Sequence, residues 1–301
     1  MSSVEHPLSH THAAAPPGSI WQRIQYCDPR WLYVLFAAMV VVFEFWRPAM
    51  PTVVPASVQR LYDLIERLPH DKLVIVDSEL AAGIRAECEG QFIAVVRHLF
   101  RRNLRFAIMT WTTQPEGIKY ATDLSAALAR EFGKEYGRDY VIWNPITPAG
   151  GAMMQSFARD IPGLIKTDIA GTPLNDIPVM RGVQTIMDIS LVYKVSYVWD
   201  RAETPWIGFI QSVYGTPYAC GTVAIMSSSA YPFLDSGQLS GMLAGAAGAA
   251  AYERLMDAPG IGAKTVSVQS FAALFVLVAI VLGNIAMLLA RRASARMEAT
   301  V

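Results

Sequence analysis

Residues 73–110 read LVIVDSELAAGIRAECEGQFIAVVRHLFRRNLRFAIMT. The stretch opens with a short apolar run at 73–77 and closes with another at 106–110. Between them, from about residue 79 to residue 101, apolar residues recur at the spacing of one helix face. A strand, a helix and a second strand in this order form a crossover unit, which parallel strands require. The stretch therefore predicts an α/β domain.

The alternation of strands and helices continues toward the C-terminus. Three more apolar runs, at 140–143, 189–198 and 219–226, read as strands. Five strands separated by helices predict a three-layer α/β sandwich with a mainly parallel sheet, Rossmann-like or flavodoxin-like, whose strand order stays open. The expected helices cover 113–132, two short segments within 147–181, 205–214, and one long segment from Asp235 to about Met256.

Two apolar stretches, 31–46 and 271–290, lie near the two ends of the chain. Each is close to the length of about 20 residues that spans a bilayer as a helix. Aromatic residues at both ends of the first stretch suit the membrane interface, so we expect a signal-anchor that stays in the mature protein. The competing interpretation is a signal peptide cut near Val54-Pro55-Ala56.

Basic residues near the two stretches predict their orientation. Arg23 and Arg30 precede the first stretch, and Arg291, Arg292 and Arg296 follow the second, which favours both termini in the cytoplasm of a two-pass cell-membrane protein. The predicted organisation is a disordered tail at 1–30, a transmembrane helix at 31–48, an extracytoplasmic domain at 57–260, a second transmembrane helix at 269–290 and a basic tail at 291–301.

Composition excludes several functions. The chain has 25 Lys and Arg against 25 Asp and Glu, so no basic face for nucleic acid is indicated. Its three cysteines are far apart and show no CxxC pair, and no spacing of His or Cys predicts a metal site. We expect no metal and no cofactor.

Polar residues follow several of the predicted strands. Because ligands bind beyond the carboxyl ends of the strands in open parallel sheets, these residues form the candidate ligand site. The alternative is structural, since Ser78 reads as a helix cap and acids at strand ends complement helix N-termini. The candidates are Asp77, Ser78, Glu79, Thr110, Thr112, Asn144, Asp200, Ser227 and Ser228.

Motifs for nucleotide binding and for hydrolysis are missing. The first strand is followed by VDSELAAG, which has a carboxylate where a dinucleotide site needs glycines. There is no GxSxG, and the domain holds only two histidines: His70 lies at the wrong edge and His98 within a helix. Asp77 with Glu79 or Asp200 would make a carboxylate pair or bind a divalent cation, although the spacing does not demand it. Catalytic residues stay unassigned.

The segment 237–251, GQLSGMLAGAAGAAA, is unusually poor in large side chains. Read as part of a helix, it puts Gly241, Gly245 and Gly248 on a smooth surface, at a cost of about 1 kcal/mol for each glycine relative to alanine. Close packing within the domain and packing against another subunit both explain such a surface.

These observations favour a membrane-anchored and non-catalytic α/β domain that serves as an interaction or accessory subunit. The expected partners are the lipid bilayer and other membrane protein subunits, or further copies of this chain. The alternative is an enzyme or a small-molecule-binding protein that uses the polar residues at the strand ends.

Overall fold

A computed structural model describes residues 28–46, 48, 50–111, 115–146, 150–197 and 205–298, and only the backbone at 115 and 293–298. Within it the chain forms two compact units. One is the domain, Arg47–Ser267, and the other contains the two apolar segments near the chain ends. Thr112 and Asp200, both candidate site residues, lie outside the described residues, as does most of the predicted N-terminal tail.

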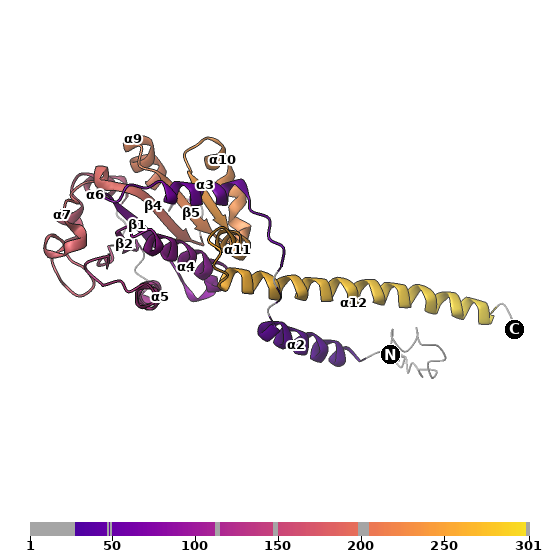
Figure 1. The fold of residues 1–301 in the computed structure, drawn as a ribbon. Coiled ribbons are helices and arrows are strands. Elements are labelled where there is room, and N and C mark those ends of the chain that lie inside the picture. The colour runs from indigo at the N-terminus through magenta and orange to yellow at the C-terminus, as the bar shows by residue number, and fades with distance from the viewer. Residues whose placement is uncertain are drawn as a thin grey trace, which may run out of the picture. The chain divides into compact units, whose positions relative to one another are not determined.

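The domain holds a six-stranded parallel sheet with the strand order β3-β2-β1-β4-β5-β6, the order of Rossmann-like folds (Figure 1). The predicted α/β class is confirmed, and the flavodoxin-like order is not the one found. The strands are β1 (Leu73–Ser78), β2 (Phe106–Met109), β3 (Tyr140–Ile142), β4 (Ile189–Ser196), β5 (Tyr218–Thr222) and β6 (Gly241–Ala244).

Helices pack on both faces of the sheet because alternate residues of each strand point to opposite sides. On β1, Val74 and Val76 join one apolar cluster, and Leu73 and Ile75 join the other. Residues of α3 (Ala56–Glu66), α4 (Arg85–Arg101), α5 (Pro115–Glu131) and α11 (Gly245–Leu255) contribute to the first cluster. Residues of α6 (Gly151–Arg159), α7 (Ile161–Ile165), η5 (Trp206–Gln211) and α10 (Ser227–Asp235) contribute to the second.

Short elements complete the connections. They are η1 (Ala82–Ile84), η2 (Leu174–Asp176), η3 (Pro178–Met180), η4 (Ile186–Asp188), α9 (Ser212–Tyr214) and η6 (Ala224–Met226). The two short helices expected within 147–181 are confirmed as α6 and α7. The helix expected at 205–214 is divided, because its first part, η5, is a π-helix and only its last turn is α-helical.

The long helix predicted from Asp235 to Met256 is wrong. The segment instead contains the end of α10, the strand β6 and the helix α11. Gly241 therefore lies in a strand, and a Cβ there would come within 2.8 Å of the Leu61 backbone on α3. Gly245 begins α11 with a φ of +57°, and Gly248 packs against Leu243 of β6. All three glycines are thus in close contact with the chain's own domain.

The described part of the chain has two helices that are long and apolar enough to cross a membrane, α2 (Pro29–Trp46) and most of α12 (Ile261–Glu298). Aromatic rings join these segments: Phe43 stacks on Phe271 with centroids 3.8 Å apart, and Phe36 lies 5.5 Å from Phe275. The helix α12 extends beyond the predicted span, 269–290, in both directions.

Candidate functional site

The candidate site lies at the carboxyl ends of β1 and β4, the central pair of the sheet. In the order β3-β2-β1-β4-β5-β6, β2 and β3 are added on one side of β1, and β4, β5 and β6 are added on the other side. The order of strands therefore switches between β1 and β4, and ligands bind near such a switch point in open α/β sheets. Asp77 of β1 lies directly opposite Lys194 of β4. The parallel pairing therefore brings an acid and a base together at this edge.

Three charged side chains form a compact group, which we call the Asp77–Glu79–Lys194 cluster. The Lys194 Nζ is 3.4 Å from Asp77 Oδ2 and 3.0 Å from Glu79 Oε1. Ser196 donates its hydroxyl to the second oxygen of Glu79 at 2.7 Å. The Asp77 and Lys194 side chains are 0% and 1% exposed, and that of Glu79 is 13% exposed. Two carboxylates thus share one ammonium group inside the protein.

An indole covers the innermost member of this cluster. Trp206 donates its Nε1–H to Asp77 Oδ2 at 2.9 Å and is itself buried. It is the first residue of the π-helix η5, a local geometry that is frequent at functional sites. Trp111 and Phe157 meet the Trp206 ring edge to face, each with centroids 5.7 Å apart. An aromatic group therefore separates Asp77 from solvent on this side.

The surroundings of Asp77 favour its neutral form. Burial raises the pKa of Asp77 to about 6, with the Glu79 charge adding to the shift and Lys194 opposing it. Asp77 Oδ1 and Ser78 Oγ are buried and have no hydrogen-bond partner among the described residues. One acceptor oxygen and one hydroxyl thus make no hydrogen bond with the described residues although they lie beside an ion pair. Burying such groups without a partner costs folding free energy.

The structure brings only some of the predicted candidates together. Asp77 and Glu79 meet through Lys194, whereas Ser78 and Thr110 are buried near the ends of their strands. Asn144 is exposed after β3. Ser227 and Ser228 donate to the carbonyls of Ala224 and Ile225, so their hydroxyls serve the turn between η6 and α10.

The sequence alone did not point to Lys194, Ser196 or Trp206. Lys194 belongs to the cluster, Ser196 donates to Glu79, and Trp206 donates to Asp77. Lys194 and Ser196 lie within the run ISLVYKVS, which reads as a strand. A single lysine inside an otherwise buried strand was the available signal, because lysine is almost never fully buried without a partner. Nothing near Trp206 in the sequence links its indole to Asp77, 129 residues away.

A second buried polar group surrounds His98, which the sequence places within a helix. His98 Nε2 is 2.9 Å from Glu66 Oε1, and Nδ1 is 2.6 Å from the Tyr252 hydroxyl. Burial lowers the pKa of His98, although Glu66 opposes the shift. The three side chains connect α3, α4 and α11, so this group holds helices together on the face away from the Asp77–Glu79–Lys194 cluster.

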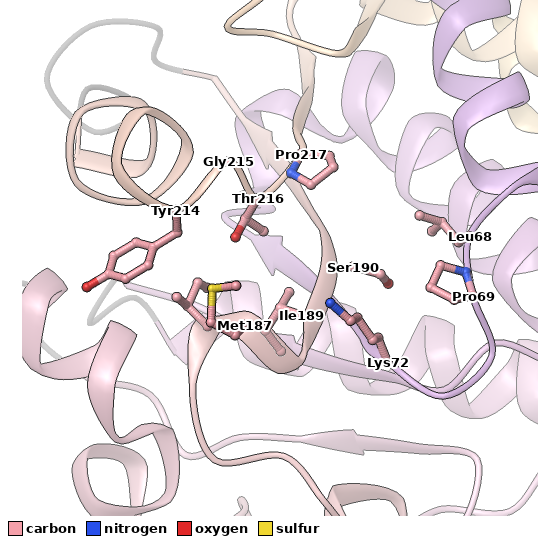
Figure 2. A pocket seen from close by; sticks show the side chains of 11 residues that line it. Leu68, Pro69, Lys72, Met187, Ile189, Ser190, Tyr214, Gly215, Thr216 and Pro217 are labelled. Carbon is pink, nitrogen blue, oxygen red and sulfur yellow. The ribbon is translucent and has the colours of Figure 1, made fainter.

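Among the described residues, three cavities of the domain lie away from the cluster. The first, of about 280 Å³, opens where β1, β4 and β5 begin (Figure 2). The cluster lies at the opposite edge of the sheet, where β1 and β4 end. Figure 2 shows Lys72, Met187, Ser190 and Tyr214 among the residues around it. The second, of about 360 Å³, lies between α4, α5 and the end of α11, and the third, of about 760 Å³, lies beside the start of α12.

Across the described part of the chain, no group of three or more His, Cys, Asp or Glu side chains is arranged to hold a metal ion. The cluster has two carboxylates, and its third charged member is a lysine, which donates hydrogen bonds and does not ligate cations when protonated. The Asp77–Glu79 pair thus already has its cation.

No protein-family model, curated protein or solved structure matches this chain. Its function is therefore inferred from its own residues.

Proposed function

We propose that this chain is a two-pass membrane protein whose α/β domain acts as a non-catalytic subunit of a membrane assembly. The observation that carries the proposal is the hydrogen bond from Ser267 Oγ to the Pro48 carbonyl at 3.0 Å. Pro48 follows α2 by two residues, and Ser267 immediately precedes the apolar part of α12. The domain segments that border the two apolar helices thus meet at one place, an arrangement that suits two spans in a single membrane.

The covered switch point supports a non-catalytic role. Trp206 and Lys194 already occupy one oxygen of the Asp77 carboxylate, and the carboxylate is fully buried. Because Asp77 is 0% exposed, a reacting group would reach either oxygen only after neighbouring side chains move. The absence of phosphate-binding glycines after β1 agrees with the same interpretation.

Membrane extraction tests the anchoring. We expect the full chain to stay in the pellet after alkaline carbonate treatment, and to do so when either span alone is deleted. Recovery of the full chain in the supernatant would contradict membrane insertion. Deletion of both spans serves as the matched control and should release the domain.

Native electrophoresis tests the role as a subunit. We expect the chain, extracted in a mild detergent, to migrate in a complex larger than a monomer and to be crosslinked within it. Migration only as a monomer, with and without crosslinker, would contradict a role in an assembly. Mass spectrometry of the crosslinked band distinguishes other subunits from copies of this chain.

A second function, binding of a small molecule at the Asp77–Glu79–Lys194 cluster, is favoured by one specific observation. Asp77 Oδ1 and Ser78 Oγ lack partners among the described residues, and a ligand with a hydroxyl or an amine would supply one. Thermal melts against a panel of polyols and amines test it. A ligand that stabilises the wild type and not Asp77→Asn supports this function, and no shift with any compound leaves the first proposal.

A further inference from the structure

The largest of the three cavities lies beside the point where the chain leaves the domain. It measures about 760 Å³, within the range of small-molecule sites. One wall is the segment after α2, which includes Pro48 and Thr52, and the other is the junction of α11 and α12. The charged residues of the lining are Glu253, Arg254, Asp257 and Lys264.

Glu253 is already used within the domain. Its carboxylate accepts the backbone N–H groups of Gly260, Gly262 and Ala263 at 2.8–2.9 Å, which caps the start of α12. The side chain is buried, so it offers the cavity no available acceptor. The other charged residues of the lining are two cations, Arg254 and Lys264, and one anion, Asp257.

The Arg254 guanidinium has more N–H donors than its hydrogen bond to the described residues uses. One of its Nη groups donates to the Thr52 carbonyl, which fixes the guanidinium across the cavity from α11 to the segment after α2. A guanidinium carries five N–H donors, and their fork geometry matches phosphate oxygens. Lys264 supplies a second cation on the first turns of α12. The lining thus suits a phosphate group beside a positively charged group.

The cavity also lies close along the chain to both apolar segments. Lys264 precedes Val268, the first residue of the apolar unit on this side, by four residues, or about 6 Å of helix rise. The headgroup layer on each side of a bilayer is about 5–8 Å thick. Pro48 on the opposite wall follows the end of α2 by two residues. Lysine side chains near helix ends commonly extend into this layer.

We propose that this cavity binds the headgroup of a glycerophospholipid, with the phosphate between Arg254 and Lys264 and an ammonium group beside Asp257. Phosphatidylethanolamine has this combination of charges and can donate hydrogen bonds from its primary amine. Phosphatidylcholine has the same charges and no N–H donor. The inference rests on the membrane anchoring proposed above.

Lipid binding to the full chain tests the inference. The chain is purified in detergent, freed of lipid, and titrated with phosphatidylethanolamine or phosphatidylcholine of identical acyl chains, with bound lipid counted by native mass spectrometry. The wild type should bind phosphatidylethanolamine more tightly. Lys264→Gln should weaken the binding of both lipids about tenfold, which is the loss expected for one charge-assisted hydrogen bond.

Asp257→Asn is the more selective variant. Asp257 has a φ of +50°, a conformation that asparagine also tolerates, so the substitution should leave the backbone intact. It should weaken the binding of phosphatidylethanolamine about tenfold and leave the binding of phosphatidylcholine unchanged. Lys72→Gln, in the cavity of Figure 2, is the matched control and should change neither.

Equal affinity of the wild type for the two lipids would overturn the proposal, as would full binding by Lys264→Gln. Carbonate extraction of the same proteins distinguishes a failure of the headgroup site from a failure of the membrane anchoring. A chain that stays in the membrane and binds no phosphatidylethanolamine contradicts the headgroup site alone. A chain released by carbonate contradicts the anchoring on which the site depends.

Discussion

At the scale of single residues, buried charges are the most informative feature of this protein. Asp77 and Lys194 are almost completely inaccessible, and each would be costly to bury alone. Their position on adjacent central strands lets each compensate the other, and Glu79 and Trp206 complete the arrangement. The remaining cost falls on the Asp77 carboxylate, whose pKa rises to about 6.

The raised pKa of Asp77 predicts a pH dependence of stability. Between its ordinary pKa of 3.8 and its folded pKa of about 6, the folded chain binds more protons at this residue than the unfolded chain does. The contribution is complete below the ordinary value and is lost as pH rises through about 6, amounting to at most about 3 kcal/mol. Asp77→Asn should remove it, so that the stability of the variant relative to wild type increases from pH 4 to pH 7.

Denaturant titration of the purified chain in detergent at several pH values measures this difference. Asp123→Asn, on the exposed surface of α5, is the control and should keep the wild-type dependence. A constant difference between Asp77→Asn and wild type across the same range would show that Asp77 does not titrate there.

Glu253 predicts a different kind of loss. Glu253→Gln replaces one acceptor oxygen by an NH2 group, which cannot accept the N–H groups at the start of α12, so at least one backbone donor loses its partner. We expect a cost of about 1–3 kcal/mol in unfolding free energy. Glu131→Gln, which alters a half-exposed pair with Arg97, should cost at most about 1 kcal/mol. Similar losses for the two variants would contradict a capping role for Glu253.

At the scale of elements, the segment 237–251 shows how small residues serve packing. β6 lies at the edge of the sheet beside α3, and its first residue, Gly241, touches the Leu61 backbone closely. On α4, a Cβ at Gly90 would come within 3.2 Å of Ala249 of α11 and within 3.0 Å of Gly262 of α12. The glycines and alanines thus allow α3, α4, α11 and the first turn of α12 to approach one another.

Gly241→Ala should therefore destabilise the domain. Its new methyl group would lie 2.7–2.8 Å from Leu61, mostly against backbone atoms that cannot rotate away, and overpacking of this kind costs about 1–3 kcal/mol. Gly83→Ala is the matched control, because a Cβ there meets nothing within 4 Å. It should be neutral or slightly stabilising, by up to about 1 kcal/mol. Thermal melts of both variants measure the difference in stability. Equal melting temperatures would show that β6 shifts enough to accommodate the methyl group without loss of stability.

At the scale of the whole molecule, the described chain consists of one α/β domain and a unit of two apolar helices. Within the domain, the bond between Ser267 and Pro48 joins the two chain segments that border those helices, 219 residues apart in sequence. If both helices are inserted as proposed, the chain should resist extraction from a membrane because both ends would have to leave together. This architecture is what the proposed function uses.

The basic residues near the spans predict the orientation of the whole protein. With both termini in the cytoplasm, a tag after Val301 should resist protease added to intact cells, while the domain is cut. Lysed cells are the control, in which tag and domain should both be cut. A protected domain with a degraded tag in intact cells would reverse the predicted topology.

The sequence by itself determined the α/β class, the two apolar helices and most strand positions, because these depend on local periodicity and on the length of apolar runs. Residues 73–110, for example, contain β1, α4 and β2 almost where their pattern predicts them. It failed at β6, because small residues around Gly241 have no periodicity that separates a strand from a helix.

Only the tertiary structure decided the strand order, the burial of Lys194 and its pairing with Asp77 and Glu79. These depend on which strands become neighbours, and no local pattern records the pairing of residues more than 100 positions apart. The same holds for Trp206 over Asp77 and for Ser267 beside Pro48. In each case a polar group that is costly to bury receives its partner from a distant segment, and only folding brings the two together.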